Sequence, residues 1–155
     1  MPPKMRFHGK ETANARPCAF PCLPMHRPDK PGTPPDKKDP VDHGEMLGDQ
    51  RIFTDELREI DDNEQPVGEV VGEHSGHCTL VRVGPGNQRI YQCFATFRLP
   101  DGLLTGRTLF DLNNVPGGQL KAAITGGTDD YSKARGEVNA IFKPGNVTIF
   151  EIDLT

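Results

Sequence analysis

The sequence predicts an all-β protein, an eight-stranded antiparallel β-barrel with a pocket inside, preceded by a disordered arm. Three observations predict this class. More than half of the chain consists of short runs in which apolar and polar residues alternate, and turn-forming residues separate these runs. No segment offers three turns of helical periodicity. Gly (17) and Pro (15) are abundant, which favours turns over long helices.

The first forty residues differ from the rest in proline content and charge. They hold ten of the fifteen prolines, and eight Lys/Arg against four Asp/Glu give this part a charge of +4. The remainder has ten basic and eighteen acidic residues, a charge of -8. We therefore divide the chain into a disordered Pro-rich leader, residues 1–44, and a β-barrel domain, residues 45–155. An acidic body argues against nucleic acid as a partner.

Targeting and metal signals are absent from the sequence. We see neither a secretory signal nor an apolar run long enough to span a membrane, so we expect a cytoplasmic protein with no membrane partner. The four cysteines are then expected to be thiols. Cys18, Cys22 and His26, with His43 beyond them, fit no established zinc spacing, so no metal site is predicted.

Eight candidate strands follow from the alternation and the breakers between its runs. Turn-forming segments such as Ser75-Gly76 and Gly84-Pro85-Gly86-Asn87 separate them. The predicted strands are 49–57, 67–74, 77–83, 88–99, 103–110, 119–125, 135–143 and 146–154. Eight strands closed into a barrel leave an interior that side chains fill or that holds one small ligand.

One hairpin has a predicted register. With Pro85-Gly86 at its tip, Cys78 faces Cys93, Leu80 faces Tyr91, and Arg82 faces Arg89. Side chains alternate across a sheet, so these residues share one face with Ala95 and Phe97, and that face is apolar except near the turn. We expect it to line the lumen, with the two arginines at one mouth. The opposed cysteines either form a cross-strand disulfide or are two small buried residues, and the expected compartment favours the second.

Several motifs resemble the allene oxide cyclase-like barrel superfamily, which includes plant dirigent proteins and bacterial barrel cyclases of polyketide biosynthesis. Their order and spacing match over about residues 47–154. The motifs are Leu47-Gly48-Asp49, Phe53-Thr54-Asp55-Glu56-Leu57, Gly76-His77-Cys78-Thr79-Leu80-Val81, Ala123-Ile124-Thr125-Gly126-Gly127-Thr128, and Tyr131 with Ala134-Arg135-Gly136-Glu137-Val138.

The resemblance implies a barrel with an apolar lumen, no metal or organic cofactor, and a homo-oligomer, either dimer or trimer. It also implies that Asp55 and Phe110 lie in the lumen and that Cys78 matches a lumen cysteine. Plant cyclases carry a functional glutamate on an early strand. The stretch that corresponds here, near Met25 to Pro34, has no glutamate, so the resemblance does not imply the plant substrate or mechanism.

The candidate site combines these inferences. The predicted catalytic residues are Asp55, Tyr91 and Arg82; for each, an ordinary structural role remains the alternative, such as a strand-end Asp55 bonded to a turn. Core packing alone is also an alternative for the predicted lumen residues. These are Phe53, Cys78, Leu80, Cys93, Ala95, Phe97 and Phe110.

We expect a cofactor-free cyclase or isomerase, including a pericyclase, of secondary metabolism. Its substrate would be an apolar, reactive intermediate such as a linear polyketide, held in the reactive conformation by the lumen. One alternative is a dirigent-like binding protein that controls stereochemistry without a catalytic step of its own. Another is a non-catalytic interaction module whose leader prolines serve as a peptide ligand.

Overall fold

The computed structural model describes residues 4–15 and 46–155, and this part of the chain is nearly all strand. Two short 3₁₀ turns, η1 (Pro116–Gly118) and η2 (Asp129–Tyr131), interrupt the strands. The strands are β1 (Lys4–Ala15), β2 (Gln50–Ile60), β3 (Pro66–Val83), β4 (Arg89–Leu99), β5 (Gly102–Asp111), β6 (Gln119–Gly127), β7 (Gly136–Lys143) and β8 (Val147–Leu154).

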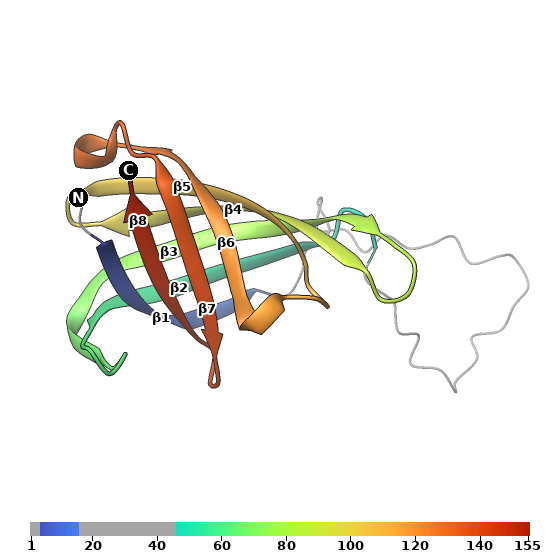
Figure 1. Cartoon of the computed structure of the whole chain (residues 1–155), viewed down its shortest axis with the longest axis horizontal. Coiled ribbons are helices and arrows are strands. Elements are labelled where there is room, and N and C mark those ends of the chain that lie inside the picture. Colours follow the sequence, from blue (N-terminus) through green and yellow to red (C-terminus); the bar gives the residue numbers. More distant parts are fainter. Residues whose placement is uncertain (1–3, 16–45) are drawn as a thin grey trace, which may run out of the picture.

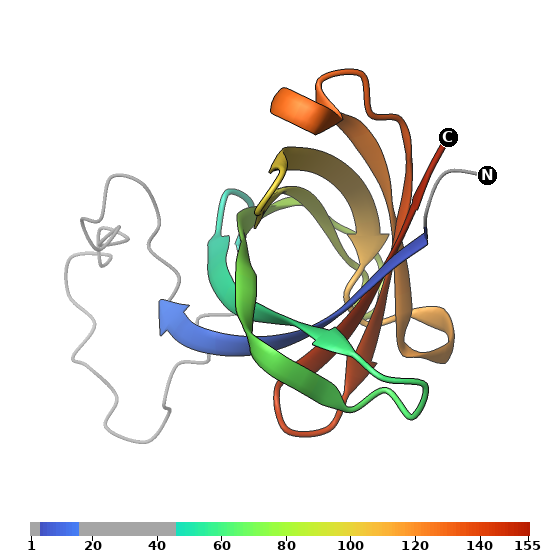
Figure 2. The ribbon, with the colours of Figure 1, turned by 90° about the vertical axis from the view of Figure 1, so that its left-hand side faces the viewer.

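The eight strands form a closed antiparallel barrel in chain order, which confirms the predicted fold class. Each strand pairs with the next, and β8 pairs back with β1, where Phe150 is the partner of Phe7. Figure 1 shows the strands crossing the barrel side by side, and Figure 2 shows them enclosing its axis. Closure satisfies every strand edge and leaves an inner face that can be shaped independently of the outer one.

The first strand comes from the segment that the sequence analysis assigned to a disordered leader, and that assignment is wrong for residues 4–15. The alternation is present in the sequence: Phe7 and Gly9 are buried, whereas Lys4 and Lys10 are exposed. This short alternating run is followed by a proline-rich stretch, so the composition of the first forty residues as a whole predicts disorder. The rest of the predicted leader, and the possible site at Cys18, Cys22, His26 and His43, lie outside the described residues.

The predicted strands 67–74 and 77–83 are one long strand, β3, because Ser75-Gly76 is not a turn. Ser75 and Gly76 pair in register with Thr96 and Ala95 of β4. A Cβ at Gly76 would collide with the carbonyl oxygen of Phe94, so this glycine allows two strands to approach closely rather than the chain to reverse. Two predicted strands merge into β3, and β1 is an additional strand that the sequence analysis does not predict. The number of strands therefore remains eight.

The predicted hairpin register is confirmed over its central part. Cys78 pairs with Cys93 and Leu80 with Tyr91. The pairing of Arg82 with Arg89 is wrong, because an irregularity after Leu80 shifts the register and pairs Arg82 with Ile90. A bulge of this kind inserts an extra residue and re-aims the side chains beyond it.

The apolar core closes one end of the barrel. Leu57, Leu104 and Ile152 are completely buried there, in a cluster that also contains Phe7 and Phe97. A smaller cluster of Leu80, Tyr91 and the two central cysteines lies toward the other end of the strands. No helix within residues 4–15 or 46–155 has the length and apolar character needed to cross a membrane.

Candidate functional site

A cavity of about 830 Å³ occupies the lumen, within the size range of small-molecule sites. Its walls are mostly apolar, with Phe97, Val138 and Phe150 among the buried contributors. It extends to the end of the barrel where β2 begins and where the turn from β7 to β8 contributes Pro144 and Gly145. A preformed apolar cavity of this size can take up a small molecule and remove it from water.

Two titratable side chains meet at the cavity wall, Asp55 of β2 and His74 of β3. They are direct cross-strand partners, and only 7% and 8% of the respective residues is exposed. The imidazole Nδ1 lies 2.7 Å from Oδ2 of Asp55. Buried polar groups cost free energy unless they are hydrogen-bonded, and this contact satisfies Nδ1 of His74 and Oδ2 of Asp55.

Aromatic rings surround the imidazole of His74. Its centroid lies 5.2 Å from that of Phe53, 4.4 Å from that of Phe97 and 4.5 Å from that of Phe150. Phe97 and Phe150 also contact each other edge to face. These rings exclude water from the pair, and electrostatic interactions are stronger where water is excluded.

A second carboxyl group lies next to the pair. Glu11 of β1 is the cross-strand partner of Asp55 and lines the same cavity. Directly opposed residues have Cβ atoms about 5 Å apart, so the two acids are close neighbours. Partial burial, and then the negative charge of Asp55, raise the pKa of Glu11 above its ordinary value. Glu11 therefore holds a proton at a higher pH than a solvated glutamate does.

The structure brings most of the predicted site residues together at the cavity. Asp55 is one of them, so a strand-end role bonded to a turn does not describe it. The predicted residues that line the cavity are Phe53, Asp55, Cys78, Cys93, Ala95, Phe97 and Phe110.

Three predicted residues do not line the cavity. Leu80 and Tyr91 are buried in the smaller core cluster, with Tyr91 packed against Phe110. Arg82 is exposed beyond the register shift. The predicted placement of Tyr91 and Arg82 at a catalytic site therefore does not match the geometry.

Sequence reasoning missed His74 and Glu11. The inner face of β3 continues with period two from Leu80 and Cys78 through Gly76 to His74, but the turn predicted at Ser75-Gly76 ended the pattern too early. Glu11 was missed because its strand was assigned to the leader. The signal for both was the same alternation that located the hairpin.

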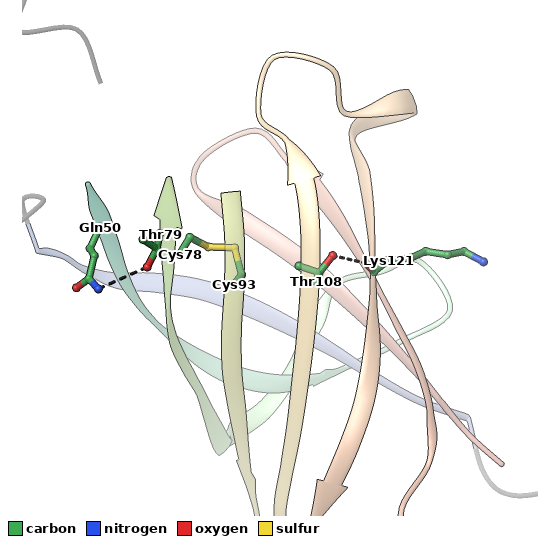
Figure 3. Close-up of a disulfide and its surroundings, with 6 residues drawn as sticks. All are labelled: Gln50, Cys78, Thr79, Cys93, Thr108 and Lys121. Carbon is green, nitrogen blue, oxygen red and sulfur yellow. Dashed lines mark hydrogen bonds between the residues drawn. A yellow bond between two sulfur atoms is a disulfide. The ribbon is translucent and has the colours of Figure 1, made fainter. Parts of the chain in front are cut away.

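The two cysteines that the register placed opposite each other are bonded. Cys78 and Cys93 form a disulfide between β3 and β4, drawn in Figure 3, so the expectation of two free thiols is wrong for this pair. Both line the cavity. Figure 3 also shows a hydrogen bond between Gln50 and Thr79 and another from Thr108 to the Lys121 carbonyl on neighbouring strands.

The described part of the chain contains no cluster of His, Cys, Asp and Glu that could hold a metal ion.

The sequence profile of the allene oxide cyclase barrel-like domain matches residues 34–147, more than half of the chain. The chain belongs to the allene oxide cyclase barrel-like family. This confirms the resemblance found in the sequence. No curated protein sequence matches the chain.

Solved structures with the same barrel include both enzymes and dirigent proteins. The chain is similar to a pyocyanin demethylase, with a TM-score of 0.68 and 25% identity over 99% of this chain and 100% of that one. For an exo-specific intermolecular Diels-Alderase the TM-score is 0.62 and the sequence identity 13%, over 98% of this chain and 97% of that one. For a pterocarpan synthase dirigent protein the TM-score is 0.58 and the sequence identity 17%, over 98% of this chain and 85% of that one. The last two likenesses concern the fold alone.

Proposed function

We propose that this barrel is a cofactor-free cyclase or isomerase that binds an apolar, reactive natural-product intermediate in its lumen. A linear polyketide with a diene or an epoxide is a substrate of this class. The observation that carries the proposal is the buried Asp55–His74 pair at the wall of a mostly apolar cavity. The family supports a barrel of the cyclase or dirigent type, and the pair favours an enzyme.

The cavity supplies the first part of the catalysis. Cyclisation of a flexible molecule is limited by how rarely it adopts the folded, reactive conformation. A dry lumen that accepts mainly this conformation lowers the barrier by several kcal/mol, with about 7–11 kcal/mol as the ceiling for ideal orientation. This contribution needs only the shape of the lumen.

The titratable groups supply the second part. Asp55 accepts the hydrogen of Nδ1 and orients the imidazole, which leaves Nε2 of His74 to take a proton from the substrate or return it. Glu11, with its raised pKa, is placed to donate a proton at the same end of the cavity. Tyr91 and Arg82 have no part in this scheme, because neither lines the cavity.

The buried pair also bears on the alternative of a dirigent-like binding protein. A protein that only holds a molecule can use a polar pair to orient it, but it needs no group that takes up and returns a proton. A non-catalytic interaction module has still less use for such a group, and for an open cavity of this size.

A second candidate function is the chemistry of the pyocyanin demethylase. It is favoured by one observation, the similarity at 25% identity over essentially the full length of both chains. The same lumen would then accept a flat aromatic molecule between its phenylalanine rings.

The test is turnover by the full chain. The wild type is incubated with linear polyketide dienes and epoxides and with pyocyanin, and the products are separated by mass. An isomer of equal mass, formed faster than in buffer, supports the cyclase or isomerase; loss of a methyl group from pyocyanin supports the second candidate. We expect His74→Phe to lower the rate roughly 10²–10⁴-fold. Tight binding of these compounds without any rate gain would reject an enzyme and leave the dirigent-like role.

A further inference from the structure

We infer that Cys78 and Cys93 form a covalent capture site for electrophilic ligands of the lumen, and that their disulfide keeps this site closed. The inference rests on the proposed function, because a reactive intermediate such as an epoxide is itself an electrophile. It adds a modification site inside the cavity and the redox condition under which that site opens.

Both cysteines belong to the inner wall of the barrel. Cys78 of β3 and Cys93 of β4 are direct cross-strand partners that line the cavity, and 9% and 6% of the respective residues is exposed. Side chains alternate along a strand, so Cys78 lies on the same face of β3 as His74, four residues earlier. The disulfide is therefore part of the surface that a ligand in the lumen contacts.

Small residues line the wall between the disulfide and His74. Strand residues advance about 3.3 Å each, so the backbone positions of Cys78 and His74 are about 13 Å apart. Ala95 and Gly106, paired partners on β4 and β5, line the cavity between these two levels. An elongated ligand with its reacting segment beside His74 can therefore extend along this wall to the disulfide.

The two redox states of the pair differ in their reactivity toward such a ligand. The thiolate is the nucleophilic form of cysteine, and a disulfide contains none. A small dithiol such as dithiothreitol reduces the bond, becomes a cyclic disulfide itself and leaves two thiols in the lumen. A thiolate then attacks an epoxide carbon: the C–S bond forms as the C–O bond breaks, and the resulting alkoxide takes up the proton that the thiol released. The chain gains the full mass of the epoxide.

Capture has a consequence for the proposed enzyme. A thioether fixes the ligand inside the cavity and excludes the next molecule. The disulfide therefore protects an enzyme that acts on electrophiles from alkylation by its own substrates, and reduction exposes it to them.

Single-thiol variants of the full chain test the inference without a reductant. All carry Cys18→Ser and Cys22→Ser, which remove the two cysteines outside the described residues. Adding Cys78→Ser leaves Cys93 as the only thiol, and adding Cys93→Ser leaves Cys78. The control is Cys78→Ser/Cys93→Ser with Leu109→Cys, because Leu109 of β5 is 64% exposed and does not line the cavity. The parent, with the pair intact, is measured before and after treatment with dithiothreitol.

Each protein is incubated with three electrophiles, and the adducts are located by mass spectrometry. Styrene oxide is an apolar epoxide and glycidol a polar one. A maleimide on a long polyethylene glycol chain is too large for the lumen, and it reacts with a lumen cysteine only if the barrel has unfolded.

We expect the preference for styrene oxide over glycidol to be about tenfold greater at a lumen thiol than at the control thiol, because the apolar lumen concentrates the phenyl ring. The polymer-bound maleimide modifies the control thiol and spares the lumen thiols. The parent gains no epoxide until dithiothreitol is added.

Three results would overturn the inference: an equal preference at lumen and control thiols, alkylation of the intact pair, or modification of the lumen thiols by the polymer in both single-thiol variants and in the reduced parent. Turnover by the oxidised parent separates this inference from the proposed function. If linear polyketide epoxides are isomerised but the lumen thiols show no apolar preference, the inference fails and the proposed function stands. If the lumen thiols capture styrene oxide but no compound is converted, the capture site is supported and the proposed function fails.

Discussion

Asp55 and His74 are direct neighbours across β2 and β3, with Oδ2 of the carboxylate 2.7 Å from Nδ1 of the imidazole. An ionised carboxylate only accepts hydrogen bonds, so the hydrogen of a neutral imidazole lies on Nδ1. Nε2 is then the nitrogen available to a ligand in the lumen. The proposed chemistry depends on this tautomer.

Asp55→Asn is predicted to reverse the tautomer. The asparagine amide can donate to Nδ1, and the imidazole hydrogen then moves to Nε2. The nitrogen chemical shifts of the His74 ring, measured by NMR at a pH where the ring is neutral, distinguish the two forms. Asp153→Asn on the exposed end of β8 should leave the wild-type pattern unchanged. The same tautomer in Asp55→Asn as in wild type would show that the carboxylate does not set it.

Glu11 gives the folded state a pH dependence of defined sign. Burial and the charge of Asp55 raise its pKa above the ordinary 4.5, so the folded chain binds this proton more tightly than the unfolded chain does. The contribution of Glu11 to stability is greatest below pH 4.5 and is lost as the pH rises through the raised pKa. Glu11→Gln cannot titrate and escapes this loss.

We therefore expect Glu11→Gln to gain stability relative to wild type as the pH is raised from 4 to 7. Urea unfolding of both proteins across this range measures the difference. Glu137→Gln, a change to an exposed residue of β7, is the control. If the stability of Glu11→Gln relative to wild type stays constant or falls as the pH rises, the upward shift of the Glu11 pKa is contradicted.

Reduction of the Cys78–Cys93 disulfide is predicted to destabilise the barrel. The bond joins residues 15 positions apart, and closing a loop of that size stabilises a folded chain by about 3 kcal/mol. Urea unfolding with and without dithiothreitol measures the loss. The Cys78→Ala/Cys93→Ala variant should resemble reduced wild type and should not respond to the reductant. A wild type that is equally stable in both conditions would show that the bond contributes nothing.

Two glycines with positive φ are predicted to differ in their tolerance of alanine. Gly136, at φ +145°, begins β7, and a Cβ there would collide with the backbone carbonyl of Asp153. Gly145, at φ +80°, lies in the turn between β7 and β8 with open space around it. Gly136→Ala should cost about 2–4 kcal/mol and Gly145→Ala about 1 kcal/mol in thermal unfolding. Equal losses would mean that crowding at Gly136 adds nothing to the backbone penalty.

The homo-oligomer expected from the sequence stays a prediction. Sedimentation or light scattering of the full chain would measure its mass directly. A mass of two or three chains is the expected result, and a mass of one chain at micromolar concentration would contradict it.

The inner face of the barrel could be predicted wherever the alternation was unbroken. Cys78, Cys93, Ala95 and Phe97 were placed correctly because a period of two leaves only one face for apolar residues. The prediction is wrong where a local irregularity changes the register between two paired strands. The irregularity after Leu80 moved Arg82 out of its predicted pair, and no residue type in the sequence marks such a shift.

The two missed site residues have a common cause. The sequence predicts a turn at Ser75-Gly76, which ends the strand that carries His74 too early. In the structure Gly76 instead permits close contact between two strands. Glu11 is not predicted as a site residue because the prolines that follow its strand place the whole segment in the predicted disordered leader. The expected compartment favours two small buried cysteines, whereas the predicted register, which places Cys78 opposite Cys93, agrees with the disulfide that the structure contains.

Deuterium incorporation during turnover tests the central claim most directly. A compound that the chain converts to an isomer is incubated in D₂O, and the product is analysed by mass spectrometry for wild type and His74→Phe. If His74 moves a proton during the reaction, the wild-type product gains deuterium at one carbon, and the variant forms product slowly or not at all. A product formed at the same rate and with the same deuterium content by both proteins would contradict a role for the Asp55–His74 pair.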